Sequence, residues 1–348
     1  MHTGPTFRHA TATSGSRLVA ILTAGVSALA AAQAVPTIGK VGELAEERVP
    51  WHGSSVSYGV AATALTFTPD FELTYNPTVA HRIGITPQWH FNDDFFVSGR
   101  FFLSQEFTKS DFTNSLHEVE LSDLWLDANW AGWKEKHSGI KVQGGLRFVL
   151  PTSKVSQAQG RVLRLSPGAS LSRAFPVLSG LIFQYTGRFT YRFNRFDNFQ
   201  NQGPTITRCG LGGADDCPSI LSTGVRAIQF DVFHGPTVVF LPHPRVILAA
   251  TFFMQYGYLP KLQATDATLS IDRPNSPEWR NFWGSAISAT WQTWDTIAFT
   301  LGAFTFSNQL DLNSRYVVPL FNRNTVISLD MTVDIESLVS NVKPKEKS

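Results

Sequence analysis

The feature that most constrains the fold is the segment 181–196, LIFQYTGRFTYRFNRF, whose chemical character changes at every residue. Its odd positions include Phe183, Tyr185 and Phe189, whereas its even positions include Arg188 and Arg192. Successive side chains of a β-strand point to opposite faces, so the segment predicts a strand with one aromatic face and one cationic face. Soluble sheets also alternate, so the fold depends on whether such segments recur without helices to cover them.

Similar alternation recurs along the chain and predicts about twelve strands. The predicted strands are 55–68, 79–91, 95–108, 118–130, 140–150, 163–173, 181–196, two segments that start near 225 and 246, 282–294, a segment ending near 307, and 327–337. A phase slip near Ser122 predicts a β-bulge, and the Gly235-Pro236 pair predicts a kink in the eighth strand. Fourteen strands stay open, because residues 261–273 have room for an extra hairpin.

The connections between these strands alternate between long and short along the whole chain. Transmembrane β-barrels have this asymmetry, with short periplasmic turns and longer extracellular loops, and an even strand count returns both ends of the chain to the periplasm. Trp283 and Trp291 lie eight residues apart on one predicted face. In a tilted strand this separation is about 20 Å, close to the distance between the aromatic girdles of a barrel, so both are predicted girdle residues. The predicted fold is therefore an all-β, antiparallel transmembrane barrel that is apolar toward lipid and polar toward its lumen.

Composition agrees with this fold and excludes several classes of function. Charged residues make up 16% of the chain, which contains 27 Phe and 9 Trp, and the net charge of +2 argues against a general nucleic-acid binder. The mean hydropathy of −0.05 is lower than a helical membrane protein would have. No phosphate-binding loop, zinc-protease or EF-hand motif is present. Ser170, Ser172 and Ser288 lie outside any nucleophile elbow, and the histidines are scattered, so we expect no catalytic, cofactor or metal site.

The ends of the chain predict export. Residues 1–34 combine a modestly basic start, a short apolar run and a small-x-small cleavage site that ends at Ala34, as in a secretory signal peptide. An uncleaved anchor helix is the alternative, although the run is shorter than the ~20 residues needed to span a bilayer. The expected organisation is a signal peptide at 1–34, a periplasmic lead at 35–53, the barrel at 54–338 and a polar tail at 339–348.

Cys209 and Cys217 are the two cysteines of the chain, and they lie in its longest predicted loop up to that point. In an exported protein such a pair predicts a disulfide that closes a small loop. A metal or redox site is the alternative, but it lacks both C-x-x-C spacing and a nearby histidine.

Over nearly its whole mature length the chain resembles a porin-like Gram-negative outer-membrane β-barrel. The resemblance implies insertion into the outer membrane by the barrel-assembly machinery, and we expect a monomer. One departure is the C-terminus, because such barrels commonly end with an aromatic residue, whereas this chain ends in PKEKS.

Charge recurs on the predicted lumen face. The inward positions carry Arg82, Arg100, Lys141, Arg147, Arg164, Arg188 and Arg192 on the second to seventh strands, and Asp231, Asp330, Asp334 and Glu336 on the eighth and twelfth. One interpretation is a water-filled lumen with a basic wall and an acidic wall, which makes the barrel a channel for small polar, preferably anionic or polyhydroxylated, solutes. The other is that the charges pair and fill a closed structural or surface-interaction barrel. A barrel enzyme acting on lipid is a third hypothesis. It would need a serine and a histidine close together on the outward face, and His81 is the only histidine on a predicted outward strand face.

Overall fold

The computed structural model describes residues 49–67, 77–108, 116–197, 226–261, 278–310 and 315–342. Their strands are β1 (Ser55–Thr63), β2 (Val79–Thr86), β3 (Gln88–His90), β4 (Phe95–Glu106), β5 (Val119–Leu121), β6 (Leu124–Lys134), β7 (Lys141–Leu150), β8 (Arg161–Phe175), β9 (Gly180–Asn194), β10 (Phe230–His243), β11 (Val246–Tyr258), β12 (Trp279–Gln292), β13 (Ile297–Asn308) and β14 (Val326–Asp334). The helical segments are η2 (Ala64–Thr66), α2 (Lys154–Ala158) and α3 (Ile335–Val342).

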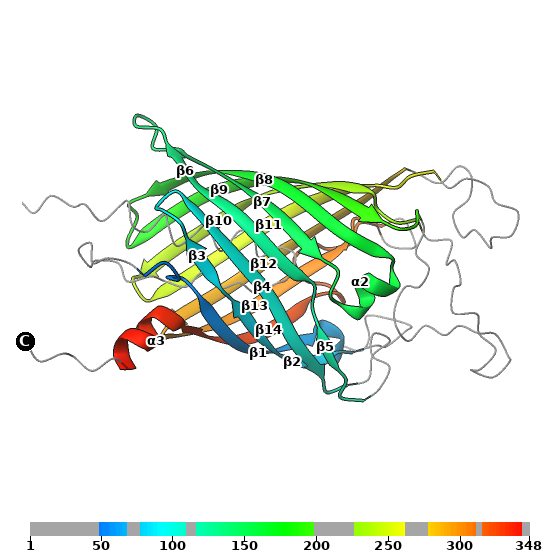
Figure 1. The fold of residues 1–348 in the computed structure, drawn as a ribbon, viewed down its shortest axis with the longest axis horizontal. Helices are drawn as coiled ribbons and strands as arrows, with labels where there is room; N and C mark the ends of the chain where they lie inside the picture. The colour runs from blue at the N-terminus through cyan, green and yellow to red at the C-terminus, as the bar shows by residue number, and fades with distance from the viewer. Residues whose placement is uncertain are drawn as a thin grey trace, which may run out of the picture.

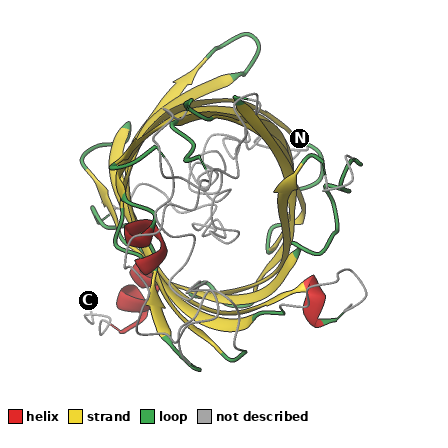
Figure 2. Cartoon of the chain, turned by 90° about the vertical axis from the view of Figure 1, so that its right-hand side faces the viewer, coloured by secondary structure: helices red, strands yellow, loops and turns green. Residues whose placement is uncertain are grey.

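These strands form one closed antiparallel barrel with twelve positions around its wall (Figures 1 and 2). Neighbouring positions around the wall follow the order of the chain, and β1 closes the ring by pairing with β14 on one side and β2 on the other. Fourteen labelled strands fill twelve positions because β2 and β3 both pair with β4, as do β5 and β6. The predicted number of twelve strands is therefore confirmed.

Local irregularities fall partly where the sequence predicts them. The expected disruption near Ser122 is present, since β5 ends at Leu121 and β6 starts at Leu124. At Gly235-Pro236, where the sequence predicts a kink, β10 is continuous from Phe230 to His243 and keeps its register with β9, but its pairing with β11 is interrupted at these two residues. The last strand is shorter than predicted, because β14 ends at Asp334 and the chain continues as α3.

The two ends of the barrel differ. At one end lie short turns, 91–94, 135–140, 176–179, 244–245 and 293–296, together with α3 (Figure 1). The other end carries the longer connections, including the segment that contains α2. This arrangement follows the predicted alternation and places the start of β1 and the end of β14 on the short-turn side, which is the periplasmic side in outer-membrane barrels.

The outer wall is apolar. Outward positions alternate with inward ones along the strands, and many of them are exposed hydrophobic residues, such as Tyr58, Val60, Ile83, Val97, Leu126, Phe148, Leu171, Phe183, Leu248, Ile287, Leu301 and Leu329. Exposed aromatic residues gather near the short turns, at Trp89, Phe91, Phe95, Trp130, Trp133, Trp291 and Trp294. A second aromatic group lies near the long loops, where Phe230 stacks on Tyr258 and Trp279 contacts both rings edge-on. A surface of this kind is stable in lipid and not in water.

The inner wall is polar, and its hydroxyl groups bond between neighbouring strands. Thr237 and Thr251 are 2.9 Å apart, as are Thr290 and Thr300. Because the ring of strands closes through β1, the wall has no end strand whose unpaired backbone groups would face lipid. The chain is a transmembrane β-barrel of the outer-membrane type.

Three predictions concern residues outside the described ranges. They are the signal peptide at 1–34, the Cys209–Cys217 disulfide, and an extra hairpin within 261–273, of which only Lys261 is described. Among the described residues, no helix has the length and apolar character needed to cross a bilayer.

Candidate functional site

The inner wall carries the candidate site, and its best-buried ion pair joins β6 to β7. Asp127 and Arg147 are direct partners in the antiparallel register. Arg147 Nε donates to Asp127 Oδ1 at 2.6 Å and its Nη2 donates to Oδ2 at 3.1 Å, a two-point contact that fixes both side chains. The guanidinium also lies over the inward-facing Trp125 ring at 4.3 Å, and Arg100 lies over the same ring at 5.5 Å.

A second pair crosses a strand instead of joining direct neighbours. Arg82 on β2 and Asp330 on β14 are both register partners of Gly59, on the β1 strand between them. Arg82 Nη2 donates to Asp330 Oδ1 at 2.6 Å, directly above this glycine. A Cβ at position 59 would lie 1.9 Å from Asp330 Oδ1, so the absence of a side chain at Gly59 makes the contact possible. The pair links the three strands at which the barrel closes.

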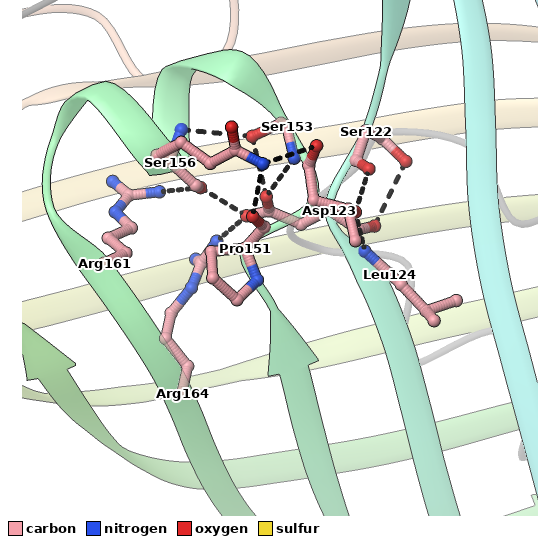
Figure 3. Close-up of polar contacts among 10 residues, drawn as sticks. Ser122, Asp123, Leu124, Pro151, Ser153, Ser156, Arg161 and Arg164 are labelled. Carbon is pink, nitrogen blue, oxygen red and sulfur yellow. Dashed lines mark hydrogen bonds and ion pairs between the residues drawn. The ribbon is translucent and has the colours of Figure 1, made fainter.

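Asp123 forms a node near the long-loop end (Figure 3). Its Oδ1 accepts from the backbone N–H and hydroxyl of Ser153, and its Oδ2 accepts from Ser156 and from Arg164 Nη2 at 2.5 Å. Ser153 is also the N-cap of α2. Arg161 Nη1 donates to Ser156 Oγ at 3.0 Å, which extends the network. One carboxylate therefore anchors the α2 segment to β8 and to the start of β6.

Arg192 and Asp231 make the fourth pair, between β9 and β10. Arg192 donates from Nη2 to Asp231 Oδ2 at 2.6 Å, and Gln255 Nε2 donates to Asp231 Oδ1 at 2.8 Å. Both oxygens of Asp231 are therefore engaged by side chains from the two strands that flank β10.

These contacts change the predicted charge pattern. Asp231 and Asp330 were expected on an acidic wall facing a basic one, but they are the partners of Arg192 and Arg82 on nearby strands. These two carboxylates are therefore each paired with an arginine and do not form a separate acidic wall. Glu336 lies outside the wall, in the first turn of α3, whereas Asp334 is the last residue of β14 and accepts the Ser337 N–H at 2.7 Å. Lys141 starts β7 at the short-turn end and is partly exposed.

Arg188 differs from the four paired arginines. Within the described part of the chain it has no carboxylate at ion-pair distance, and its one hydrogen bond is a 3.4 Å contact from Nη1 to the Ser166 carbonyl. It lies at one side of a recess in the inner wall of β6–β9, which we call the Arg188 recess; its lining is Asn129, Trp130, Gln143, Gly144, Gly145, Gly168, Ala169, Ser170, Gln184, Thr186 and Arg188. Arg188, Gly168, Gly145 and Asn129 are consecutive partners across four strands. The two glycines remove side chains from the wall beside the guanidinium, which contributes to the hollow.

The β10–β13 side of the inner wall is aromatic, which the sequence analysis did not predict. Phe253 is 1% exposed, and its ring centroid is 5.2 Å from that of Phe233, 5.9 Å from Phe304 and 6.0 Å from Phe306. Phe282 stacks on Phe306 at 5.1 Å. Phe252 and Phe253 are adjacent and both aromatic, so the alternation in β11 is not visible at this point of the sequence. Which of the two faces the lumen follows only from the pairing of β11 with its neighbouring strands.

The predicted girdle residues Trp283 and Trp291 both lie on the outward side of β12. Trp291 is 57% exposed, whereas Trp283 contacts Tyr316 at a centroid distance of 5.8 Å. The segment that contains Tyr316 folds over the outer wall: Ser285 Oγ donates to the Pro319 carbonyl at 2.9 Å, and Thr305 Oγ1 donates to the Leu320 carbonyl at 3.0 Å. It thereby satisfies outward hydroxyl groups that would otherwise face lipid.

Chemistry other than solute binding has little support in these residues. No group of three or more potential metal ligands occurs in the described part of the chain. His81 lies on the outward face of β2, where Gln105 bonds its Nε2 at 2.9 Å and the Phe107 ring stacks at 4.8 Å. These contacts are those of an interfacial histidine with a hydrogen-bonding and packing role. Ser170 and Ser172 lie on the inner wall of β8 and Ser288 on that of β12, with no histidine as a register partner.

Comparisons with known proteins show similarity of fold alone. No protein-family model matches the chain, and no curated protein matches it. An outer membrane channel from Pseudomonas putida F1 aligns with a TM-score of 0.49 at 9% identity, covering 84% of this chain and 99% of that one. The NanC porin aligns with a TM-score of 0.43 at 10% identity, covering 80% and 98%. The DcaP channel of Acinetobacter baumannii aligns with a TM-score of 0.32 at 9% identity, covering 81% and 96%.

Proposed function

We propose that the protein is an outer-membrane channel, a passive transporter of small polar solutes with a preference for anions. The observation that carries the proposal is the division of the barrel into an apolar outer wall and a polar, arginine-containing inner wall. Hydroxyl, amide and charged side chains along a lumen replace part of the hydration shell that a polar solute loses when it leaves bulk water. The solved structures with a similar fold include porins and channels, which agrees with this function but does not carry it.

The anion preference rests on an imbalance of charge in the inner wall. Four arginines have a carboxylate partner, whereas Arg188 has none among the described residues. The carboxylates that act on Arg188 electrostatically, Asp127 and Asp231, are themselves held by Arg147 and Arg192. Arg188 therefore adds positive charge that favours anions over cations at this level of the lumen.

The main alternative is a closed barrel with a structural or surface-interaction role. It has specific support, since Asp127 and Arg147 are only 4% and 5% exposed, as expected for pairs that fill an interior. Liposome swelling separates the two functions. Vesicles that contain the channel swell in small sugars, with rates that fall as the sugar becomes larger, whereas a closed barrel that is folded and inserted gives no swelling with any sugar.

Several properties belong to the same proposal. We infer cleavage of the signal peptide after Ala34, delivery to the barrel-assembly machinery, insertion as a monomer, and a Cys209–Cys217 disulfide in the loop between β9 and β10. No catalytic function and no cofactor are part of the proposal. Mass spectrometry of the purified protein, with and without reductant, tests the cleavage site and the disulfide together.

A further inference from the structure

We propose that the Arg188 recess is a binding subsite for a polyhydroxylated carboxylate, such as a sugar acid. This inference rests on the proposed channel function and specifies which part of the lumen recognises the solute. Its basis is a set of polar side chains that share one hollow and that make few hydrogen bonds to the described residues.

The first element of the subsite is a cation. Arg188 has five N–H donors, and the described structure uses them only for the long contact to the Ser166 carbonyl. The position of a Cβ on Gly168 would be 3.5 Å from Arg188 Nε, so the guanidinium lies across the glycine in its neighbouring strand. A guanidinium in this position can bind a carboxylate through two parallel hydrogen bonds.

The second element is a group of unused hydroxyl and amide groups. Thr186 is 5% exposed, and its Oγ1 is buried without a hydrogen-bond partner. Ser170 is the register partner of Thr186. Gln143 is the partner of Ser170 on the next strand, but its Nε2 already donates to the Ala131 carbonyl at 3.1 Å, so it lines the hollow without being one of the unused groups. Within the described structure, the side chains of Ser170 and Gln184 also have no hydrogen bond. A buried hydroxyl without a partner costs stability, so the position of Thr186 beside an arginine, with the side chains of Ser170 and Gln184 lining the same hollow, is what a site for a hydrogen-bonding ligand requires.

The chemistry of the recess selects among anions. Its amides and hydroxyls can donate to and accept from several solute hydroxyls, which chloride and simple aromatic acids cannot offer. The aromatic side chains of β10–β13 adjoin the recess, because Phe233 is the register partner of Arg188. A benzoate-like solute would therefore prefer the Phe233 side, whereas a sugar acid would prefer the recess. The two solutes distinguish these surfaces.

The test is calorimetric titration of the folded, detergent-solubilised full barrel with glucuronate, glucose, benzoate and chloride. We expect saturable glucuronate binding that is tighter than that of the other three. Arg188→Gln should weaken glucuronate about tenfold or more, because a charge-assisted contact is lost. Thr186→Val should weaken it about fivefold, as expected for one hydrogen bond. The matched control is Thr190→Val, on the same strand and face, whose hydroxyl is already bonded to Ser166 at 3.1 Å and which should leave binding unchanged.

Several results would overturn the subsite. They are no saturable glucuronate binding by the folded wild-type protein, unchanged binding in both Arg188→Gln and Thr186→Val, equal loss in Thr190→Val, or tighter binding of benzoate than of glucuronate. Heat-dependent mobility in gel electrophoresis verifies that each variant is folded. Because the assay measures binding and not passage, swelling without glucuronate binding contradicts the subsite alone, and binding without swelling contradicts the channel alone.

Discussion

Replacing Gly59 by alanine tests the structure where the barrel closes. The new methyl group would lie 1.9 Å from Asp330 Oδ1, far inside van der Waals contact, so Asp330 must move away from Arg82. Asp330 is 3% exposed, and it keeps only the 3.0 Å hydrogen bond from Ser328 once Arg82 is displaced. Removing one partner of a buried ion pair costs 3–5 kcal/mol, and we take the low end, about 3 kcal/mol, because Arg82 is partly exposed and Ser328 remains.

Alanine also restores some stability in a strand, because glycine loses more conformational entropy on folding, by about 0.5–1 kcal/mol. The expected net destabilisation for Gly59→Ala is therefore about 2 kcal/mol, measured by urea unfolding of the barrel in lipid vesicles. Gly187→Ala is the matched control, since a Cβ at that strand position meets no atom within 4 Å. It should be neutral or slightly stabilising. Equal stabilities of the two variants would refute the proposed contact across β1.

Three further predictions concern other parts of the barrel. Asp127→Asn should lower the unfolding free energy by about 3 kcal/mol, because Arg147 would stay buried without its carboxylate, and a change below about 0.5 kcal/mol would show that water screens this pair. Asp123→Asn should speed proteolysis between residues 150 and 161 in reconstituted vesicles, since it weakens the anchor of α2, and unchanged cleavage would contradict that anchor. In the 135–140 turn, hydrogen bonds from Ser138 and His137 lower the pKa of Glu135 to about 2. The ionised carboxylate of Glu135 therefore stabilises the fold fully above the unfolded pKa of ~4.3, and this contribution is lost as the pH falls toward 2. Glu135→Gln should reduce the loss of unfolding free energy between pH 5 and pH 2.5. Identical pH profiles of stability for the two proteins would contradict this.

The strands and their faces could be predicted from the sequence because lipid and lumen impose opposite chemistry on alternate residues. In β9 the alternation from Leu181 to Asn194 is nearly perfect, and the two faces are oriented as predicted. The alternation and its turn signals are a poor guide at two positions, Pro236 and Glu336. Pro236 does not end β10: the register with β9 continues past this residue, and the residue pairs with β11 stop only at Gly235 and Pro236. Glu336 continues the alternation of β14 in sequence but belongs to α3, where the first turn of a helix favours an acidic residue.

The arrangement of charges could not be predicted in the same way. Arg82 and Asp330 are separated by 248 positions in the chain, and their contact depends on the register of two strand pairs with Gly59 between them. The Arg188 recess likewise requires Gly168 and Gly145 to align beside Arg188 across successive strands. Alternation specifies which face a residue occupies but not its level along the barrel axis. Ion pairing and recess formation both depend on that level.

The central claim, that this barrel conducts anions past Arg188, is tested most directly by single-channel recording in planar bilayers with a KCl gradient. We expect discrete conductance steps with a reversal potential that favours chloride. Arg188→Ala should move the reversal potential toward zero, whereas the double substitution Arg192→Ala and Asp231→Ala should leave it nearly unchanged, because it removes an ion pair with no net charge. Absence of conductance from folded, inserted protein, or a cation-selective current unaffected by Arg188→Ala, would contradict this claim.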